Sequence, residues 1–152
     1  MIKIPYIIVL SCFTTLTYAQ TNFDHLLLKD KIIDPNFNII NSKEFDKLMR
    51  DTTNNISSLM PMKTDAYTTL LSMNISKFGI YANYQLDDVE NTTDAEMVMY
   101  KFKMGQDYKN YLCSSEIAQS QTFKKLNAIA NVNLLNSKYE VIFNMKIPLR
   151  QC

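Results

Sequence analysis

The segment 64–86 reads TDAYTTLLSMNISKFGIYANYQL and contains two runs of apolar, β-branched and aromatic residues around a short turn. Side chains of a β-strand point alternately to opposite faces, and such residues favour strands. One side of the first run carries Tyr67, Thr69, Leu71, Met73 and Ile75. The second run carries Ile80, Ala82, Tyr84 and Leu86 on one side and Tyr81, Asn83 and Gln85 on the other. Because the intervening turn SKFG is short, the segment predicts an antiparallel hairpin.

The end of the chain repeats this pattern. Segment 131–147 reads NVNLLNSKYEVIFNMKI, and its second half alternates between two sets of side chains. One set comprises Tyr139, Val141, Phe143, Met145 and Ile147. The segment therefore predicts a second hairpin.

Helices are indicated between and before the hairpins. Asn41 precedes Glu44 by three residues, and Thr93 precedes Glu96 by the same spacing, which is typical of a capping box. The first box predicts a helix that ends by Pro61, and the second predicts a long amphipathic helix that reaches Cys113. Shorter helices are predicted over 23–31 and 116–128.

This order of elements is typical of an α+β fold. We expect an antiparallel sheet of about four strands, made of two hairpins, with helices packed on one face. A single domain would span 41–152, preceded by an N-terminal arm over 20–40 and a leader over 1–19.

The leader MIKIPYIIVLSCFTTLTYAQ has the pattern of a secretory signal peptide. Lys3 precedes an apolar run, and small residues before Gln20 predict cleavage after Ala19. The run is too short for a membrane span, so no membrane insertion of the mature chain is expected. The sequence predicts a periplasmic or secreted bacterial protein. Alternatively, Val9-Leu10-Ser11-Cys12 resembles a lipoprotein processing box, with Cys12 as the lipid anchor of an outer-membrane protein.

The 152-residue chain has three cysteines, Cys12, Cys113 and Cys152, and cleavage after Ala19 removes the first. Two cysteines in an oxidising compartment most simply pair. A bond between Cys113 and Cys152 would close a loop of about 40 residues, worth roughly 3–4 kcal/mol in the chain-entropy model. It would hold the end of the last strand against a helix, whereas a reactive thiol or an intermolecular bridge is the alternative.

Charge and composition argue against several function classes. Removing Lys3 leaves 15 basic residues (16 − 1) against 15 acidic ones, a net charge near zero. Nucleic-acid and anionic-membrane binding favour a basic face, and no such run is present. We therefore expect no nucleic-acid partner.

Residues for the common catalytic and metal chemistries are scarce. His25 is the single histidine, and the two glycines, Gly79 and Gly105, form no phosphate-binding loop. A multi-histidine zinc site is excluded. The acidic cluster is not spaced like a calcium loop; it comprises Asp87, Asp88, Glu90, Asp94 and Glu96. We expect no catalytic residues, no metal and no cofactor.

The polar side of the first hairpin is the best candidate for binding. Tyr81, Asn83 and Gln85 would share one face, away from the core. Tyr and Asn combine contact area with hydrogen bonding and are common in recognition surfaces. The sequence therefore predicts partner binding by these three residues, although an ordinary solvated strand would show the same pattern.

The stretch Met60-Pro61-Met62-Lys63-Thr64-Asp65-Ala66-Tyr67-Thr68-Thr69-Leu70 resembles a segment of small exported bacterial proteins. Their pattern is Leu-Pro-x-x-Val-Asp-x-x-Thr-x-Leu, with Met60 and Thr64 as departures here. A Tyr-x-Tyr-like strand, a mid-chain cysteine and a last cysteine complete the resemblance. It implies export and an α+β architecture, and it implies no reaction.

These features favour a small exported protein-binding module without enzymatic activity. Its partner would be a protein of the cell envelope or the medium, with a role as an envelope accessory factor or as an inhibitor or immunity protein. The alternatives are a hydrolase that acts on envelope polymers through carboxylates, and the protein anchored through Cys12.

Overall fold

The computed structural model describes residues 21–87 and 94–152. The helices are α1 (Asn22–Lys29), α2 (Ser42–Ser57), α3 (Asp94–Cys113), α4 (Glu116–Gln119), α5 (Gln121–Lys125) and the 3-10 helix η2 (Leu149–Gln151). The strands are β1 (Met62–Lys63), β2 (Thr68–Ser76), β3 (Gly79–Leu86), β4 (Ile129–Leu135) and β5 (Val141–Pro148). The predicted signal peptide, its cleavage position and Cys12 lie outside the described residues, as do Asp88 and Glu90.

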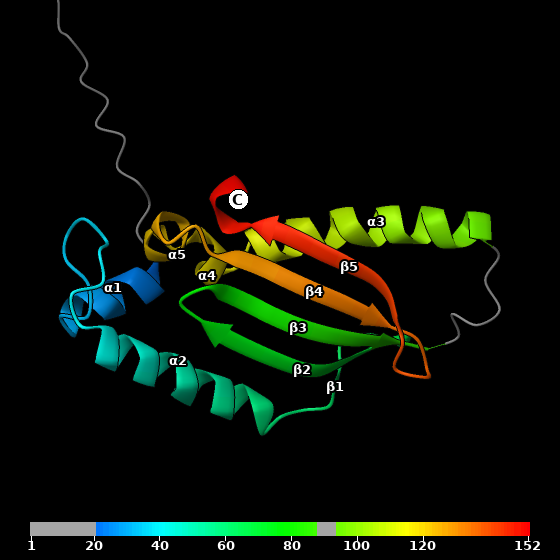
Figure 1. Ribbon diagram of the computed structural model, residues 1–152, viewed down its shortest axis with the longest axis horizontal. Coiled ribbons are helices and arrows are strands. Elements are labelled where there is room, and N and C mark those ends of the chain that lie inside the picture. The colour runs from blue at the N-terminus through cyan, green and yellow to red at the C-terminus, as the bar shows by residue number, and fades with distance from the viewer. Residues whose placement is uncertain (1–20, 88–93) are drawn as a thin grey trace, which may run out of the picture.

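The strands form one five-stranded sheet in the order β1-β2-β3-β4-β5 (Figure 1). Both predicted hairpins are confirmed, since β2 with β3 and β4 with β5 pair antiparallel. The expectation of a purely antiparallel sheet is wrong at its centre, where β3 and β4 run parallel. The reason lies in the connection, because α3, α4 and α5 carry the chain back so that Ile129 aligns with Gly79. Only a long crossover of this kind can join parallel neighbours. β1 adds a fifth strand that was not predicted.

A bulge in β2 changes which of its side chains face the core. Leu70 pairs with Tyr84, but Ser72 pairs with Asn83, so Leu71 is an extra residue on β2. A bulge of this kind reverses the alternation of side chains. Leu70 and Ile75 are both buried, and the predicted grouping of Leu71 with Ile75 on one face is therefore wrong.

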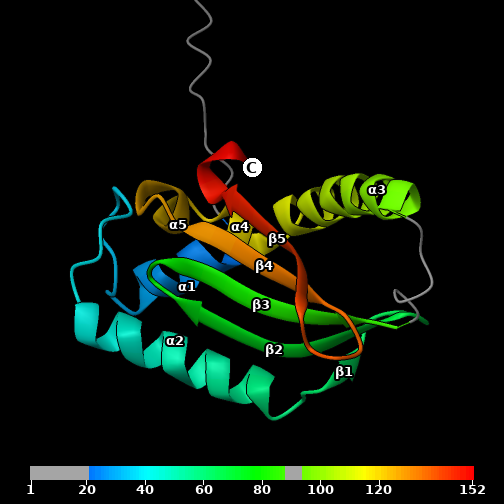
Figure 2. The ribbon, with the colours of Figure 1, turned by 45° about the vertical axis from the view of Figure 1, so that its right-hand side comes forward.

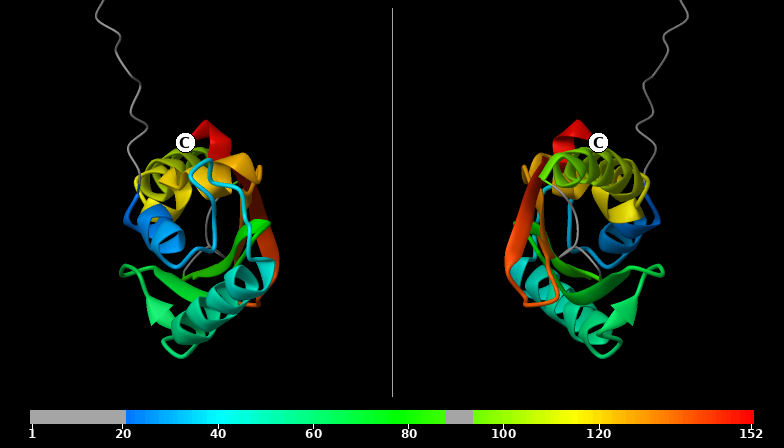
Figure 3. Two further views of the ribbon diagram at one scale, coloured as in Figure 1. Left: turned by 90° about the vertical axis from the view of Figure 1, so that its left-hand side faces the viewer. Right: turned by 90° about the vertical axis from the view of Figure 1, so that its right-hand side faces the viewer.

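The sheet is curved, and its helices lie in two places (Figures 2 and 3). α1, α3, α4 and α5 lie on the concave side, as predicted for one face, while α2 runs along the edge of the sheet at β2. Thr53 in α2 fixes this position, because its hydroxyl accepts from the backbone N–H of Ile75 at 3.0 Å and donates to the Ile75 carbonyl at 3.2 Å. α2 thus satisfies edge groups that would otherwise be open to another strand.

The core lies between the concave face of the sheet and the helices. Side chains from β3 and β4 alternate into it, and they comprise Ile80, Ala82, Tyr84, Leu86, Ala130, Val132 and Leu134. Segment 21–40, which was expected to form an arm, contributes Leu27, Ile32 and Ile33. Burial of each large apolar side chain contributes about 1.5–3 kcal/mol, so this segment adds to the stability of the domain.

A buried carboxylate joins α1 to the start of α5. Asp24 is fully buried and accepts hydrogen bonds from the hydroxyls of Ser120 at 2.6 Å and Thr122 at 2.8 Å. The backbone N–H of Gln121 donates to it at 2.8 Å, and the hydroxyl of Thr21 donates at 3.0 Å. A buried charge is tolerated when it is fully hydrogen-bonded, so Asp24 has a structural role that the sequence did not reveal.

The predicted disulfide between Cys113 and Cys152 is confirmed, with the two Cα atoms 4.9 Å apart. It joins the end of α3 to the last residue after η2. The side-chain amide of Gln119 donates to the Cys113 carbonyl at 2.6 Å and to the Cys152 carbonyl at 3.3 Å. The chain end is therefore held by a covalent bond and a hydrogen bond. Among the described residues, no helix is both long and apolar enough to cross a membrane.

Candidate partner-binding surface

Among the described residues, no helix covers the convex face of the sheet, and Figure 1 looks onto this face. The strand registers place two rows of polar side chains across it. One row is Asn74, Tyr81, Asn131 and Lys146, and the next is Ser72, Asn83, Asn133 and Asn144. Gln85 lies one row further along β3. We call these nine residues the amide face.

Hydrogen bonds connect the amide face across four strands. The side-chain amide of Asn83 donates to the Ser72 hydroxyl at 2.8 Å, and the side-chain amide of Asn133 donates to the side-chain oxygen of Asn83 at 2.9 Å. Asn144 donates to the side-chain oxygens of Asn133 and Asn131, at 2.7 Å each. These bonds fix the rotamers, so a partner would meet a pre-ordered polar surface and would lose less side-chain entropy on binding.

The three predicted binding residues lie together on this face. Tyr81 is 45% exposed, whereas Asn83 and Gln85 are half-buried. Asn83 is part of the hydrogen-bonded row, and Tyr81 lies between Asn74 and Asn131. The structure thus confirms their shared placement, while their binding role stays a prediction.

The sequence did not single out Asn131, Asn133 and Asn144 as members of the same surface. The alternation of the second hairpin could have indicated them, because its Asn residues occupy the side opposite the buried Val132 and Leu134. Alternation identifies a face but does not say which strand lies next to which. The parallel contact between β3 and β4, which was not predicted, joins the two sets of amides.

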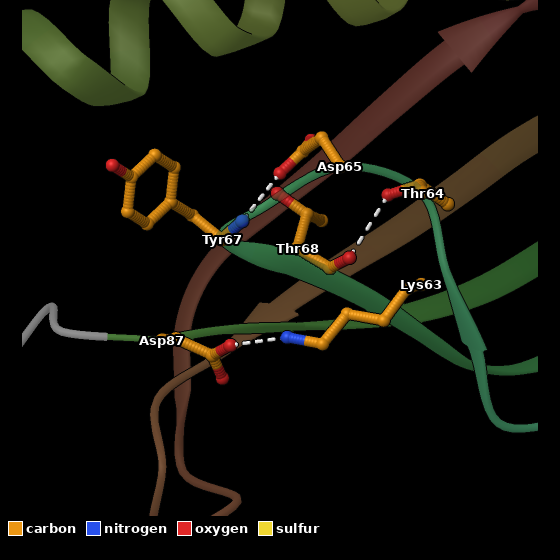
Figure 4. Close-up of polar contacts among 6 residues, drawn as sticks. All are labelled: Lys63, Thr64, Asp65, Tyr67, Thr68 and Asp87. Atoms are coloured by element: carbon orange, nitrogen blue, oxygen red, sulfur yellow. Dashed lines mark hydrogen bonds and ion pairs between the residues drawn. The ribbon is translucent and has the colours of Figure 1, made fainter.

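The segment that carries the family resemblance folds into a hydrogen-bonded turn between β1 and β2 (Figure 4). Thr64 donates its backbone N–H to the Thr68 carbonyl at 2.9 Å, and the Asp65 carboxylate accepts from the Tyr67 N–H at 2.8 Å. That N–H bond lowers the pKa of Asp65 below its usual range. The polar residues of this segment are therefore used to close a turn.

Asp87, the first residue of the acidic cluster, forms an ion pair and a backbone hydrogen bond. Its carboxylate pairs with the Lys63 ammonium at 2.5 Å (Figure 4). Its backbone N–H donates to the Tyr67 carbonyl at 2.8 Å. Asp87 thus ties the end of β3 to the β1–β2 turn.

Buried Tyr84 and partly buried Tyr108 form a pair on the concave side of the sheet. The rings of Tyr84 and Tyr108 meet edge to face, with centroids 5.7 Å apart. Burial raises the pKa of both phenols above the usual value. An uncharged phenol packed in this way supports the contact between α3 and β3.

Other candidate chemistry is sparse in the described parts of the chain. His25 is exposed on α1, a helix on the concave side of the sheet. Within residues 21–87 and 94–152, no three His, Cys, Asp or Glu side chains gather in a way that could hold a metal ion.

No protein-family model matches the chain, and no curated protein matches it in sequence. Solved structures do share its fold. One is a pilotin of the Vibrio vulnificus type 2 secretion system, EpsS, with a TM-score of 0.50 and 9% identity over 73% of this chain and 94% of that one. Another is a Pseudomonas aeruginosa protein inferred to be secreted, with a TM-score of 0.50 and 8% identity over 72% of this chain and 94% of that one. At such identities the similarity shows the fold alone.

Proposed function

We propose that the protein is a small exported accessory protein of the bacterial cell envelope, without enzymatic activity, that binds another protein through the amide face. The observation that carries this proposal is the uncovered, pre-ordered row of amides next to an exposed tyrosine. Aromatic and amide side chains supply contact area and hydrogen bonds without the cost of burying a charge.

The shared fold supports the accessory role. A protein of the type 2 secretion system and a protein inferred to be secreted both have this fold. We infer that this chain likewise serves a protein assembly of the envelope, and an inhibitor or immunity protein remains the alternative. The resemblance of segment 60–70 to small exported proteins is consistent with either role.

Export is part of the proposal. The disulfide fits an oxidising compartment, and the leader is proposed to be cleaved after Ala19. The intact mass of the protein from its native cells tests this step. A chain that begins at Gln20 and gains two hydrogens on reduction is expected. A lipid-bearing chain that begins at Cys12 would instead show an anchored protein.

Capture of partners by tagged variants tests the binding role. Tyr81→Ala and Gln85→Ala should each reduce the amount of a specific envelope protein that is recovered with the tagged chain. Tyr111→Ala is the matched control, because Tyr111 is 73% exposed and belongs to α3. Recovery that is unchanged in the Tyr81 and Gln85 variants would contradict the proposed surface.

A further inference from the structure

A groove of about 340 Å³ lies between α2 and the turn that joins β2 to β3. Arg50 and Asn54 line it from α2, and Lys77 and Phe78 line it from the turn. Asn74 belongs both to the groove and to the amide face. The groove and the amide face are therefore one continuous surface.

The turn wall of this groove is held in a fixed conformation. The Phe78 N–H donates to the Ser76 hydroxyl at 3.2 Å, and the Phe78 carbonyl accepts from the Ile129 N–H at 2.9 Å. The Lys77 ammonium lies 5.4 Å from the centre of the Phe78 ring, which is 67% exposed. A cation and an aromatic ring are thus presented together at the mouth of the groove.

Cations outnumber acids on the described part of this surface. Lys146 lies at the β5 end of the amide face, and Arg50 and Lys77 lie in the groove beyond the β2 end. Within the described residues the one ion pair is Lys63–Asp87, so these three cations have no paired carboxylate there. In the part of the chain that the structure describes, the amide face contains no acid and Asp46 is the one acid that lines the groove.

We infer that the amide face and the groove together bind an acidic segment of a protein partner; this rests on the proposed function and names the chemistry of its partner. Carboxylates of the segment pair with Arg50 and Lys77 in the groove. Its neutral part crosses the amides, and a further carboxylate reaches Lys146. Three strand spacings separate Asn74 from Lys146, so the segment crosses about 14 Å of sheet. Complementary charge at both ends would fix its register and direction.

A random peptide library displayed on phage, panned against the mature disulfide-bonded chain, is the probe for this inference. We expect the selected peptides to be enriched in Asp and Glu relative to the unselected library. Binding of a synthetic selected peptide should weaken about twofold to fivefold in Arg50→Gln and in Lys77→Gln, and about tenfold in the double variant. Raising the ionic strength from about 0.01 M to about 1 M should also weaken binding, because the screening length falls from roughly 30 Å to 3 Å.

Matched controls separate the groove from charge in general. Arg150→Gln and Lys103→Gln remove exposed cations from η2 and α3, and neither should change the affinity. The inference would be overturned if the selected peptides were neutral or basic, or if panning gave no enrichment. It would also be overturned if the affinity for the peptide were unchanged by the Arg50 and Lys77 substitutions.

This test and the capture experiment can fail independently. Capture of an envelope protein that depends on Tyr81, together with peptides that lack acids, would keep the protein-binding role and overturn the acidic partner. Acidic peptides that depend on Arg50 and Lys77, without any Tyr81-dependent capture, would support the acid-binding groove and contradict the proposed function.

Discussion

The two faces of the sheet use the same strands for different purposes. On the concave face, apolar side chains such as Val132 and Leu134 are buried under helices. On the convex face, their neighbours Asn131 and Asn133 bond to other amides and remain half-buried. The stability of the fold therefore depends mainly on one face, which leaves the other available for binding. Substitutions on the two faces should separate stability from partner recognition.

The largest expected loss of stability is at Leu134 in β4, and the neighbouring residue Asn133 provides the comparison. Leu134→Ala should lower the free energy of unfolding by about 2–5 kcal/mol, because it removes a buried side chain and leaves a cavity. Asn133→Ala should cost about 1 kcal/mol, because it breaks half-exposed hydrogen bonds. Urea unfolding measures both values. Equal losses in the two variants would contradict the division between the faces.

Removing the disulfide should have the next largest effect. The Cys113→Ser and Cys152→Ser double variant should lose about 2–4 kcal/mol of unfolding free energy, because its unfolded chain is less constrained. The single-residue variant Gln119→Ala is a useful comparison, since it removes only the hydrogen bonds to the two cysteine carbonyls. If the double variant unfolds at the same urea concentration as the native chain, the covalent link contributes little to the fold.

The two glycines should respond in opposite ways to alanine. Gly79 has a φ of 132°, and an added Cβ would lie 1.9 Å from the Ile129 carbonyl oxygen, so Gly79→Ala should cost about 1–3 kcal/mol. Gly105 lies within α3, and its added Cβ would meet the Met145 sulfur at an ordinary 3.5 Å. Gly105→Ala should stabilise the protein by up to about 1 kcal/mol, because alanine favours helices. Thermal unfolding of both variants checks the contrast, and destabilisation by Gly105→Ala would show a tighter contact between α3 and β5.

The smallest effect concerns the turn at Asp65. Its pKa is lowered in the folded state, so its contribution to stability is present above the ordinary carboxyl pKa of 3.8 and is lost as the pH falls through the lower folded value. Asp65→Asn should therefore remove a small part of the acid sensitivity and should leave partner binding unchanged. Urea unfolding of both proteins at neutral and acid pH measures this difference. A greater acid sensitivity in the variant would contradict the assigned sign.

Local patterns predicted much of this fold. Alternation identified both hairpins, and the cysteine count predicted the disulfide. The helix start at Asn41 is confirmed by the bond from the Glu44 N–H to the Asn41 side chain, although the Asn41 N–H donates to the Ile32 carbonyl and so does not complete a capping box. Each of these signals lies within a short stretch of sequence or follows from the expectation that the chain is exported. They also placed Tyr81, Asn83 and Gln85 on one face.

The remaining features depend on contacts between distant segments. The parallel pairing of β3 with β4, the bulge at Leu71 and the bonds to Asp24 all join elements that no local pattern connects. The candidate surface was therefore predicted only in its first three residues. Its asparagines on β4 and β5 and the groove beside α2 follow from how the hairpins and helices assemble.

A photocrosslinking amino acid placed at position 81 in living cells tests the central claim most directly. Position 111 is the matched control, because both sites carry a tyrosine and both are exposed. We expect a discrete crosslinked protein from position 81, an absence of that product from position 111, and loss of the product when Asn133→Ala is added without unfolding the chain. If position 81 yields no product, or if both positions yield the same one, the amide face is not the binding surface.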